Sequence, residues 1–311
     1  MTISEVTYDR YSEAISQHPH VFNTPSFVAL NAPKADDVRY LLFEDGSKVR
    51  LAMVLGERGG RLLSPFSAPF GGFSAAKEQR LETVNEAVEL LADYARERQQ
   101  DVRIVLPPQF YAPNLIGHSI NALSRVGELQ YIDLNYYFPL SKVDNYESSL
   151  ERSARKNLHR ALGAGFDFFA IQPSDVDMIR RAYEVIRINR AEHDYKLSMT
   201  WEDVSATIKI VRADFFLLCL DGKDVAAAQV FHVAEGIAQV IYWGDVRAYS
   251  HLRPMNYLVH RIFEHYRREG LRVLDIGPST QEGQPNYGLC EFKTSIGCQL
   301  TPKFVFDIKG K

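Results

Sequence analysis

The sequence predicts an α/β protein with mixed sheets, built as two tandem copies of one α/β unit. An Asp-Gly pair, which is a strong hairpin signal, occurs at 45–46 in the first half and at 221–222 in the second. Helical periodicity alternates with short apolar strands in both halves. Matching elements follow in the same order, roughly 170 to 180 residues apart. We therefore place the domains at residues 1–142 and 143–311.

In the first half, two strands flank the first Asp-Gly turn, which is a hairpin signal, and the segment 77–98 has apolar residues at helical spacing. The loop 65–72 contains two prolines and ends in Gly-Gly, so it can be neither a helix nor a central strand. The expected elements of this half are a helix at 9–17, strands at 38–44, 48–56 and 61–64, a helix at 77–98, a strand at 102–106, a helix at 114–125 and a strand at 131–138.

The second half repeats this order after an additional basic helix, which two glycines at 163 and 165 terminate. A hairpin forms across the second Asp-Gly turn, and a third strand follows it. The expected elements are a helix at 145–164, a strand at 167–171, helices at 175–192 and 201–211, strands at 215–220, 225–233 and 237–244, a helix at 257–269, a strand at 273–276, a helix at 288–296 and a strand at 304–308.

Composition excludes several classes of protein. With 46% hydrophobic and 24% charged residues and a net charge of −3, the chain is neither disordered nor a basic protein that coats duplex nucleic acid. Three scattered cysteines are too few for a disulfide framework or a zinc site, so we expect no metal site. We also expect no resident cofactor. The absence of a signal sequence and of a membrane span predicts a cytoplasmic location.

A local basic patch lies in the helix that opens the second half. Arg152, Arg155, Lys156 and Arg160 stand close to a single acid, Glu151. Such a patch on a nearly neutral chain suggests a discrete phosphate-bearing anion, and the alternative interpretation is a solvated helix face. Arg155 and Arg160 lie about 140° apart around the helix. Only one of them is expected to grip an anion, and Arg155 is our choice.

The element order resembles the GNAT acyltransferase fold, and the last helix carries part of its motif. Asn286, Leu289, Phe292, Lys293 and Gly297 occupy the motif's offsets. Lys293 replaces the tyrosine that, in those enzymes, protonates the departing CoA thiolate. The segment 247–254 also lacks the glycines whose backbone N–H groups cradle the CoA pyrophosphate. Both departures put acetyl-CoA use in doubt.

In both departures this sequence resembles the FemAB-like family of tandem GNAT-fold transferases. These enzymes move an aminoacyl group from tRNA onto an amine of a peptidoglycan precursor. Five short stretches carry this resemblance, and they span both halves. They are residues 65–72, 155–165, 252–258, 275–277 and 292–297.

The resemblance implies an enzyme that forms an amide between an activated acyl or aminoacyl donor and an amine acceptor. Aminoacyl-tRNA or an acyl-CoA would then be a co-substrate, and the donor would be an anionic, phosphate-bearing small molecule or a tRNA. Two alternatives stay open. One is a CoA-dependent GNAT N-acetyltransferase, and the other is a non-catalytic ligand-binding protein that kept the fold.

The candidate site residues come mainly from the second half. Lys293 is expected to act by its charge, with an ordinary pKa, on a phosphate or an oxyanion. Asp275 follows a strand, where it could accept the proton of the amine or could simply form a turn. His232 and His251 have no visible partner and are treated as structural. The expected substrate-binding residues are Arg155, Asn157, Arg160, Arg253, Phe292, Gly71 and Gly72.

Overall fold

The computed structural model describes residues 1–311 and has the mixed α/β fold that the sequence predicts. The chain divides into two units. The first unit holds Met1–Asn135, Thr280–Gln284 and Thr301–Lys311, and the second holds Tyr136–Ser279 and Pro285–Leu300. The sequence analysis placed one boundary after residue 142. It had no signal for the two later segments that return to the first unit.

The first unit contains the strands and helices that the sequence predicts, together with β1 and α2. Its elements are β1 (Thr2–Val6), α1 (Tyr8–Ala14), α2 (Pro25–Asn31), β2 (Asp37–Asp45), β3 (Lys48–Arg58), β4 (Arg61–Ser64), α3 (Leu81–Arg98), β5 (Val102–Val105), α4 (Pro113–Val126), the first part of β6 (Glu128–Pro139), the short hairpin that begins at β12 (Thr280–Gln281), and most of β14 (Gln299–Ile308).

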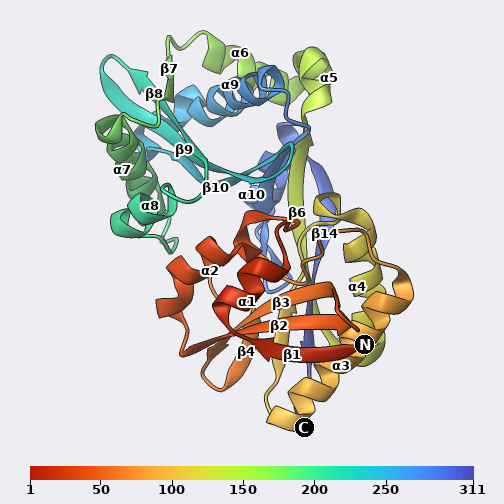
Figure 1. The fold of residues 1–311 in the computed structure, drawn as a ribbon. Helices are drawn as coiled ribbons and strands as arrows, with labels where there is room; N and C mark the ends of the chain where they lie inside the picture. The colour runs from red at the N-terminus through yellow and green to blue at the C-terminus, as the bar shows by residue number, and fades with distance from the viewer. The chain divides into compact units, whose positions relative to one another are not determined.

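Helices cover both faces of the sheet in the first unit (Figure 1). The strand order is β1-β2-β3-β4-β5-β14-β6. Because side chains alternate along a strand, β2 sends Leu41 and Phe43 to one core with α3, and Tyr40 and Leu42 to another core with α1 and α2. The sheet is therefore buried on both faces.

The second unit has the same layering. Its remaining elements are α5 (Tyr146–Ser149), α6 (Arg152–Leu162), β7 (Asp167–Ile171), α7 (Val176–Glu192), α8 (Trp201–Thr207), β8 (Ala213–Leu220), β9 (Lys223–Ala234), β10 (Ile237–Asp245), α9 (Pro254–Arg268), β11 (Val273–Pro278) and α10 (Tyr287–Ser295). The two residues of β13 (Gln284–Pro285) are divided, with Gln284 in the first unit and Pro285 in the second.

Its strands follow the order β6-β11-β10-β9-β8-β7. Helices α7 and α8 pack on one face, where Phe215, Leu217 and Ala227 are buried against them. The opposite face of β8 carries Phe216, whose ring meets Tyr266 of α9 edge-on at 5.8 Å. This sandwich leaves the carboxyl ends of β10 and β11 as the place where a ligand can enter.

The structure differs from the sequence prediction at several element boundaries. Strand β1 and helix α2 were not expected. The helix expected at 145–164 is two helices, α5 and α6, because Leu150 between them has an extended backbone (φ −73°, ψ 144°). Helix α9 begins at Pro254, earlier than expected, since proline is well suited to the first turn of a helix.

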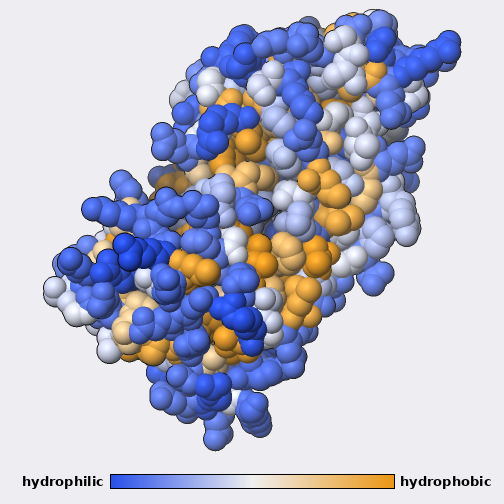
Figure 2. All heavy atoms as spheres, turned by 90° about the vertical axis from the view of Figure 1, so that its right-hand side faces the viewer, coloured by the Kyte–Doolittle hydropathy of each residue, from blue (hydrophilic) through white to orange (hydrophobic).

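None of the helices combines the length and the apolar composition that a crossing of the bilayer requires. On the face drawn in Figure 2, hydrophilic side chains cover most of the surface and hydrophobic ones gather in small groups among them.

A buried carboxylate ties three strands of the first unit together. Asp307 is 2% exposed, and it lies directly opposite Arg103 in the β5–β14 ladder. Arg103 donates from Nε and Nη2 at 2.8 and 2.9 Å, and Arg61 of β4 donates at 2.8 Å. Burial would raise the pKa of Asp307, but these arginine hydrogen bonds outweigh it and hold the pKa below its usual value.

We expect Asp307→Asn to lower the free energy of unfolding by about 2 kcal/mol near neutral pH, because it removes charge-assisted hydrogen bonds. Since the folded pKa is depressed, this contribution is present above the unfolded pKa of about 3.9 and is lost as pH falls through the folded value. Urea unfolding at neutral pH and at pH near 3 measures both effects. Asp93→Asn, on the exposed side of α3, should change stability by less than about 0.5 kcal/mol.

Candidate functional site

Strands β10 and β11 pair as parallel neighbours over a short stretch that ends at Gln239 and Asp275. Both strands continue beyond it, β10 to Asp245 and β11 to Pro278. The residues beyond the paired stretch line a cavity of about 620 Å³ within the second unit. A cavity of this size can hold a small ligand or the reactive end of a larger one.

Close packing of α7 on β10 shapes one wall of this cavity. Gly244 has no side chain, and a Cβ atom there would lie 2.2 Å from the side chain of Asn189. Asn189 is buried and donates from Nδ2 to the backbone oxygen of Asp245 at 2.8 Å. Glycine at 244 therefore allows α7 to approach the strand end and fix it.

Arg190, the next residue of α7, places a cation in the cavity wall. Its guanidinium carbon lies 5.6 Å from the ring centre of Tyr195 and 5.1 Å from that of Tyr242. Its Nε is buried and has no hydrogen-bond partner. Burial lowers the pKa of Arg190, but a guanidinium stays charged at neutral pH. The arrangement provides a fixed cation with donor capacity for an anionic group.

Asp245 places a carboxylate in the same wall, at the end of β10. Ser250 donates from its hydroxyl to Asp245 Oδ2 at 2.7 Å. Burial raises the pKa of Asp245 above its ordinary value, although the Ser250 hydrogen bond opposes this change. A carboxylate with a raised pKa is a stronger base than an exposed one, so Asp245 is a candidate proton acceptor.

His193 follows at the end of α7 and also lines the cavity. Its Nδ1 lies 2.8 Å from the backbone oxygen of Asn189, which can only accept a hydrogen bond. The proton of a neutral His193 ring therefore sits on Nδ1, and Nε2 carries the lone pair. The ring also stacks on Tyr195, with centres 5.7 Å apart.

Lys293, the first predicted catalytic residue, lines the cavity but is 4% exposed. Its Nζ donates to the backbone oxygens of Ile276, Gly277 and Pro278 at 3.2, 2.9 and 2.9 Å. Burial lowers its pKa to about 8, so the ordinary pKa expected from the sequence is wrong. In this arrangement all three ammonium protons are donated to the end of β11, and Lys293 ties that end to α10.

Asp275, the second predicted catalytic residue, is fully buried beneath the strand end. It accepts hydrogen bonds from Gln239 Nε2 at 3.0 Å and from the backbone N–H of Gly277 at 2.9 Å. Gly277 has a positive φ of 76°, which glycine adopts without strain. These contacts form a turn, and Asp275 is not part of the cavity lining.

Three predicted substrate-binding residues do line the cavity: Asn157, Arg253 and Phe292. Arg253 is exposed and has a left-handed backbone (φ 61°) immediately before α9. Phe292 of α10 meets Trp243 of β10 edge-on, with ring centres 6.2 Å apart. The fold thus brings three distant sequence motifs to one cavity.

Four other predicted binding residues do not line it. Arg155 donates to the backbone oxygens of Glu147, Ser148 and Leu150, so it caps the end of α5. Arg160 is exposed on α6.

Gly71 and Gly72 belong to the first unit. Gly71 donates its N–H to Val105 O at 2.9 Å, and Gly72, with φ +87°, donates to Ser64 Oγ at 2.9 Å. Within the first unit these contacts are those of a turn.

The sequence analysis missed Arg190 and Asp245. The rule that singled out Asp275, an acid at the carboxyl end of a strand, applies equally to Asp245 and could have found it. Arg190 had no such signal, because it is one of several arginines in an ordinary amphipathic helix.

Lys293→Met should destabilise the second unit by about 2 kcal/mol, because three carbonyl oxygens, two of them in buried contacts, lose their donor. Lys293→Arg should cost less, since a guanidinium still donates. Urea unfolding followed by circular dichroism measures both. Lys156→Met, exposed on α6, is the control and should change stability by less than about 0.5 kcal/mol. An unchanged unfolding midpoint for Lys293→Met would contradict the structural role of this lysine.

Comparisons with known proteins agree with this architecture. Residues 148–293 match the family model described as an acetyltransferase (GNAT) domain. No curated protein matches the sequence. Among solved structures, FemX is similar with a TM-score of 0.66 and 12% identity, and the match covers 99% of this chain and 97% of FemX.

Two further structures are similar over nearly the whole chain. The C-terminal domain of an Agrobacterium fabrum protein named as a lysylphosphatidylglycerol synthetase has a TM-score of 0.63 and 15% identity, with 97% of this chain and 92% of that one covered. The tandem GNAT protein from the clavulanic acid biosynthesis pathway has a TM-score of 0.51 and 10% identity, with 99% and 98% covered. Residues 148–293 are therefore similar to the GNAT acetyltransferase domain, and the whole chain has a tandem GNAT fold like that of FemX and the clavulanic acid pathway protein.

Proposed function

We propose that this protein is a FemAB-like N-acyltransferase that forms an amide between an activated acyl or aminoacyl donor and an amine. The observation that carries this proposal is the cavity between the parted ends of β10 and β11, which holds a fixed cation and a carboxylate with a raised pKa. Arg190 would bind an anionic group of a substrate, and Asp245 would take the proton of the attacking amine.

In the proposed reaction the amine nitrogen attacks the carbonyl carbon of an ester or thioester. A C–N bond forms, the C–O or C–S bond breaks, and the departing oxygen or sulfur leaves with the electron pair and takes up a proton. Asp245 accepts the proton that the amine loses. A raised carboxylate pKa helps this step, because a stronger base accepts a proton more readily. No metal or redox group is needed for the balance.

The segment before α9 supports a donor other than acetyl-CoA. Residues Arg247–Leu252 form a short 3-10 helix, and Arg253 follows in the left-handed region. Pro254, the first residue of α9, has no N–H group, and the N–H of Asn256 is already donated to Arg253 O. Side-chain cations, Arg253 and Arg190, are therefore better placed than backbone N–H groups to hold phosphate or carboxylate.

Donor identity can be tested by isothermal titration with acetyl-CoA and with an aminoacylated minihelix RNA, followed by turnover assays with a set of amines. Binding and transfer from the charged RNA would support the aminoacyl branch of the proposal. Transfer from acetyl-CoA alone would replace it with a CoA-dependent N-acetyltransferase.

Arg190→Gln should weaken binding of the anionic donor by about 10- to 100-fold, which is the usual loss for one charge-assisted hydrogen bond. Arg190→Lys should recover part of it. The matched control is Arg187→Gln, one turn earlier on the same helix, where the arginine is exposed and paired with Glu184. Equal affinity of wild type and Arg190→Gln would remove Arg190 from the site.

Asp245→Asn should lower turnover by about 100-fold or more, because the amide cannot accept the amine proton. In wild type, kcat/KM should rise with pH as Asp245 ionises, and this ionisation lies above the usual aspartate value. The rise should be absent in the variant. Asp221→Asn, in the β8–β9 turn, is the control, and full turnover of Asp245→Asn would exclude this residue as the base.

A further inference from the structure

A second cavity of about 680 Å³ lies in the second unit and shares no lining residue with the first. Apolar side chains in and just after α8 and in β8, among them Trp201, Ile208 and Phe215, form much of its wall. Asp214 and Glu269 also belong to its lining and give it one polar side. Nothing in the proposed acyl transfer uses these residues.

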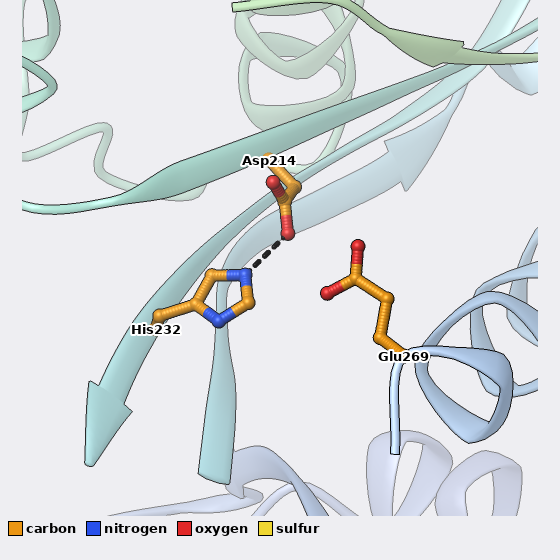
Figure 3. Close-up of side chains that lie close together, drawn as sticks. All are labelled: Asp214, His232 and Glu269. Carbon is orange, nitrogen blue, oxygen red and sulfur yellow. Dashed lines mark hydrogen bonds and ion pairs between the residues drawn. The ribbon is translucent and has the colours of Figure 1, made fainter. Parts of the chain in front are cut away.

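His232 joins Asp214 and Glu269 in a compact cluster. The imidazole nitrogen of His232 and one carboxylate oxygen from each acid all lie within 4.8 Å of one another. Figure 3 shows the three side chains directed toward a common point from two strands and from the residue after α9. His232 Nε2 and Asp214 Oδ2 are 2.6 Å apart.

The strand register explains this meeting. Asp214 of β8 lies opposite Val230 of β9, and His232 is two residues farther along β9. Residues two apart on a strand share a face, so Asp214 and His232 are diagonal neighbours on the face that α9 covers. Tyr266 of α9 donates to Asp214 Oδ2 at 2.9 Å, and Glu269 follows one turn later.

We propose that His232, Asp214 and Glu269 bind a divalent transition-metal ion of the Zn²⁺ class. One imidazole and two carboxylates suit zinc, whereas magnesium and calcium favour sites made only of oxygen. Zinc takes these ligands at about 2.0 to 2.2 Å, so neighbouring ligand atoms in a tetrahedral site lie about 3.4 Å apart. His232 Nε2 and Asp214 Oδ2 are closer than this, at 2.6 Å, and all three ligand atoms lie within 4.8 Å of one another, so shifts of about an ångström would bring the cluster to this geometry.

The surroundings also fit a metal site with an open position. The side chains of Asp214 and His232 are only 18% and 15% exposed, so water competes weakly for the ion. Tyr266 donates to Oδ2 of Asp214, the oxygen that also faces His232, and so fixes the position of this carboxylate, as hydrogen bonds to metal ligands commonly do. Three protein ligands leave a fourth position for water or a small ligand from the cavity.

Two features of the cluster weaken the binding of a metal ion. Nε2 of His232 must give up the proton of its hydrogen bond with Asp214, and that proton passes to solvent when the metal binds. Arg212 Nη2 pairs with Glu269 at 3.0 Å, and His265 Nε2 lies 3.2 Å from the same carboxylate. The Arg212 side chain is 63% exposed, so it can swing away into solvent.

The cysteine content of the sequence predicts no metal site, because short cysteine spacings mark the commonest zinc motifs. This cluster contains no cysteine, and its members at 214, 232 and 269 have none of the short spacings of zinc motifs. In the sequence His232 has no visible hydrogen-bond partner, and the fold places Asp214 beside it as that partner.

The test is a titration of tag-free, chelator-treated full-length protein with Co²⁺, followed by visible absorption. We expect one Co²⁺ per chain with the absorption of a four- or five-coordinate ion, displaced by Zn²⁺ and not by Mg²⁺. His232→Gln and Glu269→Gln should each weaken binding by at least about 100-fold, which exceeds the usual loss for an outer-shell change. Arg212→Gln should tighten binding about two- to fivefold, since it removes a competing surface ion pair.

His159→Gln is the matched control, because His159 forms an exposed pair with Glu147 that has no third ligand. Its affinity for Co²⁺ should equal that of wild type. Circular dichroism confirms that each variant is folded, and Glu269, which is exposed, tolerates replacement best. The proposal would be overturned if the Co²⁺ spectrum with wild-type protein stayed that of the hydrated ion. It would also be overturned if both ligand variants bound Co²⁺ with the affinity of wild type.

Discussion

The early separation of β10 and β11 is the constraint on which the rest of the second unit depends. Two parallel strands that part lose their shared ladder, and the freed backbone groups must find other partners. Side chains supply several: Lys293 donates to three carbonyl oxygens at the end of β11, Asp275 accepts from Gly277, and Asn189 donates to the end of β10. These polar residues keep the cavity open because they replace the missing ladder.

The same constraint explains which parts of the site could be predicted from the sequence. Hairpin turns and helical periodicity are local signals, and together with the order of the elements they predicted the tandem fold correctly. The role of each side chain depends on which groups accept its hydrogen bonds. Lys293 stands at a motif position but turns toward the carbonyls of β11, a contact between residues about 16 positions apart that no local pattern indicates.

Charge density along the chain was also a poor guide to the anion site. Four cations cluster on α6, yet Arg155 caps α5 through backbone oxygens and Arg160 is exposed. Arg190 lies in a helix of mixed charge and has a buried nitrogen without a partner. What distinguishes the two arginines is the environment: one satisfies its donors on the backbone, and the other keeps donor capacity inside a cavity.

Helix α9 links the two cavities of the second unit. Arg253 and Pro254 at its beginning line the proposed acyl-transfer site, and Glu269, immediately after its end, belongs to the His232 cluster. At 15 residues the helix is about 22 Å long. Over that distance direct charge interactions between the two sites are largely screened at physiological salt. A cation at Glu269 therefore affects the acyl-transfer site only if it moves α9. The metal site and the acyl-transfer site share no lining residue, so each proposal can be tested without the other.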